Sequence, residues 1–291
     1  MTDKGRLTGI FVGRSTLDIV YACARFPEPD GKVDAEAGYL TGGGPALNGA
    51  VAFAGLGGQA RLCSVLGSGP MADWVREDVG AHNVDLFDAA EGEAGVLPVS
   101  TVMLTDASRA IVNQPLPERT ARLEASLLER LFETSPDIVL SDGHLPELAV
   151  PILRRARETG VPTVLDGGSW KPWTAELLPW IDIAIVSSRF RPPPAGCVDD
   201  PITLLRRSAG AVATTQGAGP IRWLEGDLSG EILPPKVEAI DTLGAGDVFH
   251  GAFCHAYASG RDFPSSLEIA AGVASRACES LGPRAWIGAR A

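Results

Sequence analysis

The sequence predicts an α/β fold with a mainly parallel central sheet that helices cover on both faces. Short apolar, strand-like runs alternate with amphipathic helical runs through most of the chain. The strand-like runs are apolar along their whole length, which is typical of parallel strands that are buried on both faces. The length of 291 residues, 45% of them hydrophobic, suits one large α/β domain or two small ones.

Hydrophobic periodicity predicts each element in turn. The expected strands are Leu7–Val12, Ala60–Leu66, Ile138–Ser141, Pro162–Leu165, Ile183–Ser187 and Ala211–Thr215. The expected helices are Pro45–Leu56, Pro70–His82, Arg119–Phe132, Pro146–Thr159, Pro201–Ser208, Ala245–Tyr257 and Phe263–Ser280. Pro70 suits the first turn of its helix, because an amide at that position would have no helical partner.

Two regions break the alternation of strands and helices. Residues 18–41 alternate without a helix signal. Residues 96–113 contain two strand-like pieces, Pro98–Leu104 and Arg109–Val112, which four turn residues join, as in a β-hairpin or meander. We expect these two regions to form a small, separate sheet.

Composition restricts the partners and the compartment. The net charge of −11, from 25 basic and 36 acidic residues, argues against a nucleic-acid or acidic-membrane partner. The cysteines are odd in number and widely spaced, so we expect no disulfide framework or zinc site and a reducing, cytoplasmic location: Cys23, Cys63, Cys197, Cys254 and Cys278. No apolar run approaches the ~20 residues of a membrane span, and the N-terminus has no signal-peptide core.

The most informative segment is Asp241–Asp247, which reads Asp-Thr-Leu-Gly-Ala-Gly-Asp. Its glycines lie where a helix is expected to begin, and amides in a first helical turn point outward without helical partners. Such a turn binds anions, and Asp247 stands beside it. Alternatively, Asp247 only caps the helix and the glycines only form a tight turn; capping does not explain the adjacent Gly-Ala-Gly.

A second glycine-rich segment, Gly42–Asn48, precedes the helix expected at Pro45. Its glycines allow the backbone to approach a ligand closely, and Asn48 offers both a donor and an acceptor to a hydroxyl. Asp18 follows the first expected strand, at the end where open α/β sheets bind ligands. A carboxylate there can accept from two hydroxyls. The alternatives are an ordinary glycine loop, a surface or capping Asn48, and an ordinary loop acid at Asp18.

These segments resemble the PfkB, or ribokinase-like, carbohydrate kinases. The resemblance rests on Asp241–Asp247 with the following Val-Phe-His-Gly-Ala-Phe and on Gly-Gly-x-x-x-Asn at Gly43–Asn48, and it extends over nearly the whole chain. It implies a single domain of residues 1–291, a three-layer ribokinase-like sandwich. Its small β-sheet would be a lid, formed by segments near 18–41 and 96–113, that covers the sugar site and makes a homodimer contact.

The resemblance also implies roles for individual residues. Asp247 would be the general base, and the amides of Gly244, Ala245 and Gly246 would hold the transferring phosphoryl group. The sugar would be held by Asp18, Gly43, Gly44 and Asn48. ATP would be bound by Thr215, Gly217, Asp241, Thr242, Gly244 and Gly246. Asp241 would organise Mg²⁺ through water; a requirement for a monovalent cation stays open.

The pattern is closest to the branch that holds bacterial sulfofructose kinase, with ketohexokinase more distant. Lys32, Asn113 and His144 match the positions that hold the sulfonate in that branch, with histidine in place of arginine. Histidine cannot form the bidentate fork of arginine, so a neutral ketohexose, another sugar or a nucleoside stays open. The family's Asn-x-x-Glu motif is also missing, because residues 187–190 read Ser-Ser-Arg-Phe.

We therefore expect ATP-dependent phosphorylation of a hydroxyl on a small, ketohexose-like or related sugar. One alternative is a nucleoside kinase of the same fold. Another is a protein that binds a sugar or nucleotide without catalysis, which the missing Asn-x-x-Glu favours and the intact Asp241–Asp247 segment opposes. A dinucleotide-dependent oxidoreductase is disfavoured, because no Gly-x-Gly-x-x-Gly follows the first expected strand.

Overall fold

The computed structural model describes residues 5–105, 108–115, 122–192 and 201–288. Three features expected from the sequence therefore fall partly or wholly outside the described residues. They are the first residues of the helix expected from Arg119, Cys197, and the middle of the turn that joins the two strand-like pieces of residues 96–113.

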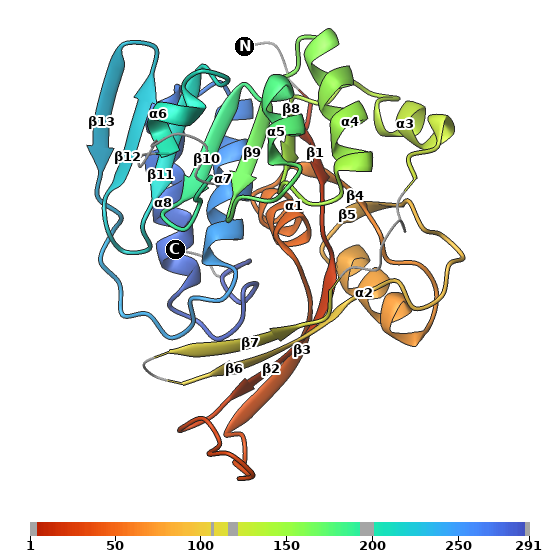
Figure 1. Cartoon of the computed structure of the whole chain (residues 1–291), viewed down its shortest axis with the longest axis vertical. Helices are drawn as coiled ribbons and strands as arrows, with labels where there is room; N and C mark the ends of the chain where they lie inside the picture. Colours follow the sequence, from red (N-terminus) through yellow and green to blue (C-terminus); the bar gives the residue numbers. More distant parts are fainter. Residues whose placement is uncertain (1–4, 106–107, 116–121, 193–200, 289–291) are drawn as a thin grey trace.

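A nine-stranded sheet, here called sheet A, forms the centre of the fold (Figure 1). Its order is β13-β12-β11-β10-β9-β8-β1-β4-β5. The strands from β5 to β11 in this order are parallel, and β12 and β13 add an antiparallel hairpin at one edge. The bounds are β1 Thr8–Val12, β4 Gln59–Ser64, β5 Val84–Asp88, β8 Ile138–Ser141, β9 Thr163–Gly167, β10 Ile183–Ser187, β11 Ala211–Thr215, β12 Ile221–Glu225 and β13 Leu228–Ile232.

Helices cover both faces of sheet A and give the fold three layers (Figure 1). One face packs on α1 (Pro45–Gly55), α2 (Pro70–Ala81), α7 (Ala245–Ala258) and α8 (Phe263–Ala277). The other packs on α3 (Ala125–Leu131), α4 (Pro146–Glu158), α5 (Thr174–Leu177) with the 3-10 turn Leu178–Trp180, and α6 (Pro201–Leu205). In β1, Phe11 joins the first core while Ile10 and Val12 join the second. Successive side chains of one apolar strand thus fill opposite layers.

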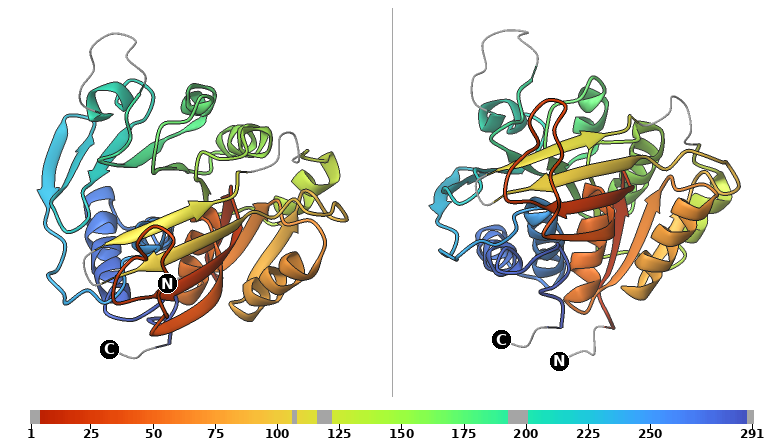
Figure 2. Two further views of the ribbon diagram at one scale, coloured as in Figure 1. Left: turned by 60° about the horizontal axis from the view of Figure 1, so that its bottom comes forward. Right: turned by 90° about the horizontal axis from the view of Figure 1, so that it is seen from below.

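A second sheet of four strands, here called sheet B, lies across one end of the molecule (Figure 2). It consists of β2 (Thr16–Ala22), β3 (Ala37–Gly43), β6 (Val99–Leu104) and β7 (Arg109–Asn113) in the order β3-β2-β6-β7. The β2–β6 pair is parallel and the other two pairs are antiparallel.

The register of sheet B places its polar residues on one face. Thr41, Asp18, Ser100 and Asn113 lie opposite one another in a single row across the strands. Because side chains alternate along a strand, Tyr39 in β3 and Arg109 in β7 share that face with Asp18. Both Tyr39 and Arg109 hydrogen-bond to residues just before α7, so this face is directed toward the body of the protein.

The α/β architecture and the small second sheet confirm the predicted fold class, and β8, β10 and β11 have the predicted bounds. Two parts of the prediction were incomplete. The helix expected from Arg119 begins only at Ala125, because residues 122–124 are not helical. Strands β5, β12 and β13, near the two edges of sheet A, were missed. They are only partly buried, so they lack the continuous apolar run that marked the central strands. Within the described residues, no helix is both long enough and apolar enough to span a membrane.

The central strands should carry much of the stability. Leu140 in β8 is fully buried, whereas Leu228 in the edge strand β13 is 66% exposed. We expect Leu140→Ala to lower the free energy of unfolding by about 2–5 kcal/mol, because it leaves a cavity between two packed layers. The matched Leu228→Ala should change it by less than about 0.5 kcal/mol. Chemical denaturation measures both values, and similar losses for the two variants would contradict the described core.

Candidate active site

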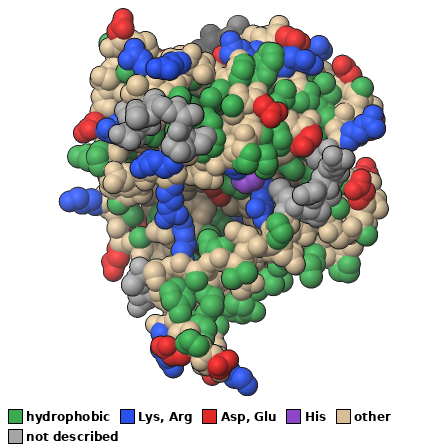
Figure 3. Space-filling view, in the orientation of Figure 1, with side chains coloured by type: hydrophobic (Ala, Val, Ile, Leu, Met, Phe, Trp, Pro, Cys, Tyr) green, Lys and Arg blue, Asp and Glu red, His purple; other side chains and the backbone are tan. Residues whose placement is uncertain are grey.

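A hollow opens between the body of the protein and sheet B, and basic and histidine side chains are visible in it (Figure 3). Hydrogen bonds show which elements meet there. Asp142, just beyond β8, accepts from the amide of Arg14 beyond β1 and from the amide of Ala46 in α1. Asn48 of α1 in turn contacts Asp247 of α7. The carboxyl ends of the parallel strands and the first turns of α1 and α7 therefore converge, as expected for a ligand site in an open α/β sheet.

Asp247 and Asn48 join the two segments that the sequence singled out. The Asn48 Nδ2 donates to Asp247 Oδ2 at 2.8 Å, across 199 residues of chain. The Asn48 Oδ1 is buried and has no partner among the described residues, so it can accept from a ligand hydroxyl. Helix α7 begins at Ala245 after a left-handed Gly244, with no side-chain cap. The amides of its first turn are therefore available to an anion, although that of Ala245 lies 3.4 Å from the carbonyl of Thr242.

The pKa of Asp247 is raised to about 7. Burial is the main cause, the nearby Asp166 carboxylate adds to it, and the hydrogen bond from Asn48 opposes it. Burial and the charge of Asp142 likewise raise the pKa of Asp166 to about 8. A carboxyl that is about half ionised at neutral pH can take up a proton and release it again, which suits a general base.

His250 lies one helical turn beyond Asp247 and links α7 to β9. Its Nδ1 lies 2.7 Å from the carbonyl of Gly246 and 3.3 Å from Asp166 Oδ2. Burial lowers the pKa of His250, which favours the neutral ring. Its Nε2 lies 3.2 Å from the carbonyl of Ile185 in β10, so each ring nitrogen faces a backbone carbonyl. His250 thus fixes the turn that carries Gly246 and Asp247.

The predicted sugar-binding residue Asp18 lies in β2, on the inward face of sheet B. Thr16 Oγ1 donates to Asp18 Oδ1 at 2.6 Å, and Ser100 in the same cross-strand row also bonds it. Burial raises the pKa of Asp18 in spite of these bonds. The backbone of Gly43 packs so closely on Asp18 that a Cβ at Gly43 would overlap the carboxylate. Gly44, the N-cap of α1, follows directly.

The three residues matched to sulfonate binding are not brought together. Asn113 ends β7 in the same row as Asp18, and the His144 Nδ1 lies 3.4 Å from Asp142 Oδ1. Lys32 is exposed in the connection between β2 and β3, at the far tip of sheet B (Figure 1). Asn113 thus belongs to the inward row of sheet B and His144 to the loop beyond β8, whereas Lys32 belongs to the connection at the tip of sheet B.

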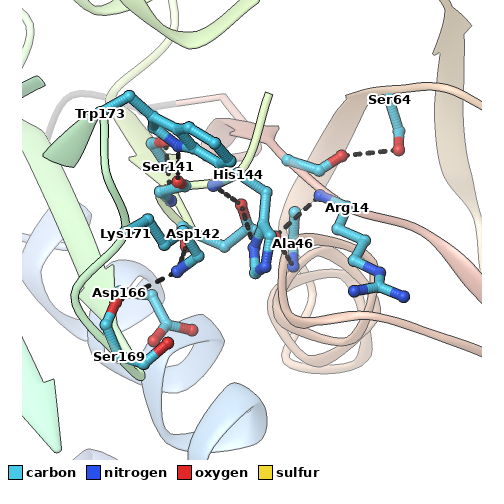
Figure 4. A network of polar contacts seen from close by, with 12 residues as sticks. Arg14, Ala46, Ser64, Ser141, Asp142, His144, Asp166, Ser169, Lys171 and Trp173 are labelled. Atoms are coloured by element: carbon cyan, nitrogen blue, oxygen red, sulfur yellow. Dashed lines mark hydrogen bonds and ion pairs between the residues drawn. The ribbon is translucent and has the colours of Figure 1, made fainter. Parts of the chain in front are cut away.

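Asp142 is a centre that sequence reasoning missed (Figure 4). It is 1% exposed and accepts from the amides of Arg14 at 2.8 Å, His144 at 2.8 Å and Ala46 at 3.3 Å. Lys171 Nζ donates to its backbone carbonyl at 3.3 Å. Burial alone would raise the pKa of Asp142, but the interactions with His144 and Lys171 outweigh it and hold the pKa below the ordinary value. A polar residue at the end of a predicted strand was the only available signal.

Sheet B also contacts the segment before α7. Tyr39 donates to Asp241 Oδ2 at 3.1 Å, and an Arg109 guanidinium nitrogen donates to the carbonyl of Thr242 at 3.1 Å. Asp241 further accepts from the amides of Gly282 at 3.0 Å and Leu243 at 2.8 Å. Burial and the charge of Asp241 raise the pKa of Tyr39, which keeps its hydroxyl protonated as a donor.

The contacts of Asp241 bear on its predicted role in organising Mg²⁺. Both of its carboxylate oxygens already accept hydrogen bonds from the protein. Across the described ranges, no group of three or more His, Cys, Asp or Glu side chains is arranged to hold a metal ion. The described residues therefore do not form a metal-binding cage of their own.

Two of the residues predicted to bind the nucleotide, Thr215 and Gly217, lie at the end of β11. Thr215 is its last residue, and Gly217 follows in a turn with φ 58°. A cavity of about 350 Å³ opens beside them. It is lined by Ser188, Arg191, Pro201, Thr214, Thr215, Gln216, Pro220 and Arg222. Sequence reasoning identified the Thr215–Gly217 turn but not the arginines on the cavity wall.

Comparisons with known proteins point to a group of carbohydrate kinases. The family model of the pfkB family carbohydrate kinases matches residues 198–287. The ATP-dependent ribose-1-phosphate kinase of Halopiger xanaduensis is 26% identical over 89% of this chain and 87% of its own length. The ribokinase of Bacillus subtilis is 25% identical over 93% of this chain and 92% of its own length.

Solved structures share the fold over nearly the whole chain. A protein of Agrobacterium tumefaciens that is provisionally assigned as a ribokinase matches with a TM-score of 0.83 and 27% identity, over 97% of this chain and 94% of its own. Arabidopsis thaliana ribokinase, complexed with ribose and ATP, matches with a TM-score of 0.74 and 22% identity, over 96% and 94%. The fold is thus ribokinase-like, and the comparisons together support the PfkB, ribokinase-like carbohydrate kinase family for this chain.

Proposed function

We propose that the protein is an ATP-dependent kinase that phosphorylates a hydroxyl of a small sugar or sugar derivative. The observation that carries this proposal is the 2.8 Å hydrogen bond between Asn48 and Asp247. This bond holds Asp247, the proposed base, beside Asn48, whose side-chain oxygen is free to accept a hydrogen bond from a sugar hydroxyl. Phosphoryl transfer depends mainly on positioning and charge stabilisation, and a hydroxyl held at this point would meet both requirements.

In the proposed reaction, Asp18, Asn48 and the backbone at Gly43 and Gly44 hold the sugar. Asp247 accepts the proton of the reacting hydroxyl, and the hydroxyl oxygen forms a bond to the γ-phosphorus of ATP. The bond from that phosphorus to the β–γ bridging oxygen breaks, and ADP leaves with the electron pair. The amides of the first turn of α7, at Gly244, Ala245 and Gly246, stabilise the charge on the transferring group.

We propose that the nucleotide enters as its magnesium complex. This fits a protein whose described acids form no metal cage, because Mg²⁺ is commonly bound through phosphates and retained waters. The Thr215–Gly217 turn and its adjoining cavity are proposed to bind the nucleoside, and Asp241 and Thr242 to order the segment nearest the phosphates. A water-mediated role of Asp241 and a monovalent-cation requirement stay predictions.

Relatives favour a pentose-type substrate over the ketohexose expected at first. Two of them are named ribokinase and ATP-dependent ribose-1-phosphate kinase, and a third is 2-dehydro-3-deoxygalactonokinase. The sulfofructose kinase branch has no support among these names, and Lys32 lies away from His144. The adenosine kinase of Sinorhizobium meliloti shares only the fold, at 17% identity, so a nucleoside kinase stays a second alternative without a feature that favours it.

Sheet B is proposed to be both a lid and a dimer contact. Its inward face carries Asp18 and the contacts of Tyr39 and Arg109. Its outward face exposes three apolar side chains, with exposed fractions of 43% for Tyr21, 47% for Leu40 and 72% for Val112. Exposed apolar patches commonly mark interfaces between proteins. A second copy of this chain is the proposed partner.

Replacing the proposed base tests the mechanism. Asp247→Asn keeps the shape and can still bond Asn48, but it cannot take up a proton. We expect kcat to fall by about 10²–10⁴, with the dissociation constant for sugar changed by less than about threefold. Coupled detection of ADP over a panel of sugars measures turnover, and titration calorimetry measures binding.

The matched control is Asp227→Asn, in the exposed turn between β12 and β13, which should keep wild-type turnover. Near-wild-type turnover of Asp247→Asn on the best sugar would rule out its role as the base. Wild-type protein that turns over no sugar would rule out the proposed activity.

The raised pKa of Asp247 predicts the acid limb of the pH profile. The base must be ionised, so kcat/KM should rise with pH and level off above about 7. Asp166→Asn removes a neighbouring acid whose titration is coupled to that of Asp247 and raises its pKa, so the limb should move toward lower pH. The control Asp227→Asn should leave the limb in place. A flat profile between pH 5 and 8 would contradict the proposed role.

A further inference from the structure

The basic side chains around Asp142 are not used by the proposed transfer reaction. Arg14 and His144 contact Asp142 through their backbone amides (Figure 4). The His144 ring also lies 3.4 Å from the Asp142 carboxylate, and Lys171 Nζ donates to its backbone carbonyl. The Asp142 carboxylate, however, is occupied by backbone amides and not by the guanidinium of Arg14 or the ammonium of Lys171. Arg14 and Lys171 thus have no carboxylate in ion-pair contact among the described residues, although Asp18, Asp142 and Asp166 lie near enough to act on their charges.

The side chain of Arg14 has only a backbone partner among the described residues. Its guanidinium donates to the backbone carbonyl of Gln114 at 2.8 Å, and its Nε is buried without a partner. No carboxylate of the described chain forms an ion pair with Arg14 or Lys171. Lys171 instead donates to the carbonyls of Asp142 and Ser169. Burial lowers the pKa of Arg14, and Asp142 and Asp18 only partly offset it. A partly buried cation without an ionic partner is costly unless a ligand supplies the charge.

Arg14 is also placed at the proposed sugar site. Gln114 directly follows Asn113, which ends β7 in the same cross-strand row as Ser100 and Asp18. The amide of Arg14 shares the Asp142 carboxylate with that of Ala46, two residues before Asn48. The Nδ1 of His144 makes no hydrogen bond of good geometry, although it lies 3.4 Å from Asp142 Oδ1. These groups border the space between the polar cross-strand row of sheet B, which contains Asp18 and Asn113, and the end of β8.

We propose that the sugar carries an anionic substituent, a phosphate or a carboxylate, and that Arg14 binds it with His144 and Lys171 beside it. This rests on the proposed function, because it concerns the substrate of the same site. The planar guanidinium suits either anion through paired hydrogen bonds. The anionic substituent would lie at the end of the sugar that is farther from Asp247. A hydroxyl at the opposite end of the sugar would then contact Asp247, the proposed base.

The test is equilibrium binding without ATP, so that it does not depend on turnover. Titration calorimetry compares ribose with ribose 1-phosphate, and fructose with 2-dehydro-3-deoxygalactonate, which separates phosphate from carboxylate. We expect at least one anionic sugar to bind about tenfold or more tightly than its neutral counterpart, as charge-assisted hydrogen bonds allow. Arg14→Met should reduce this ratio about tenfold, and Arg14→Lys should restore part of it.

The matched control is Arg154→Met, on the exposed side of α4, which should keep the wild-type ratio. Circular dichroism and the melting temperature of each variant show that it is folded. Equal or tighter binding of both neutral sugars would overturn the proposal. The proposal would also be overturned if Arg14→Met weakened the binding of neutral and anionic sugars equally. That result would indicate that Arg14 only supports the structure through its hydrogen bond to Gln114. A wild-type protein that prefers the anion but forms no ADP would refute the kinase function alone.

Discussion

The site depends on one buried carboxylate, that of Asp142. It joins three segments that are far apart in the sequence: the loop after β1, the first turn of α1 and the loop after β8. The geometry leaves no space around it, because a Cβ at Gly13 would overlap the carboxylate. A buried charge is stable only when donors surround it, and three amides do so here. The first turn of α1, which leads to Asn48, is therefore tied to the ends of β1 and β8 by this side chain.

Three acids at the same end of the sheet have different electrostatic states. The pKa of Asp142 is lowered by its donors, whereas those of Asp166 and Asp247 are raised by burial and by neighbouring negative charge. Carboxylates this close cannot all be ionised at low cost. Asp142 is ionised and positions the site, which makes proton uptake by the others easier. The pKa of Asp247, the proposed base, is thus raised in part by Asp142, an acid that is not proposed to contact the substrate.

The sequence could predict what depends on local pattern. Apolar runs located the central strands, and glycine spacing located the turn before α7 and the turn before α1. The row Thr41, Asp18, Ser100 and Asn113 depends instead on strand register, which no local pattern specified. Asp142, Asp166, Tyr39 and Arg109 were missed for the same reason. Their partners lie across large stretches of chain, 202 residues for Tyr39 and Asp241. Lys32 was matched to the same anion site as His144 by sequence pattern, yet it lies in the exposed connection between β2 and β3.

The contacts of Tyr39 and Arg109 have a thermodynamic consequence. Both belong to sheet B, and both hold the segment at 241–242 that leads into α7. A displacement of sheet B would break these bonds, so the two regions would then share one conformational equilibrium. A ligand that favoured the docked position of sheet B would raise affinity at the turn before α7, and a ligand at that turn would raise affinity under sheet B by the same factor. Such a movement would link the two halves of the site as cooperative partners.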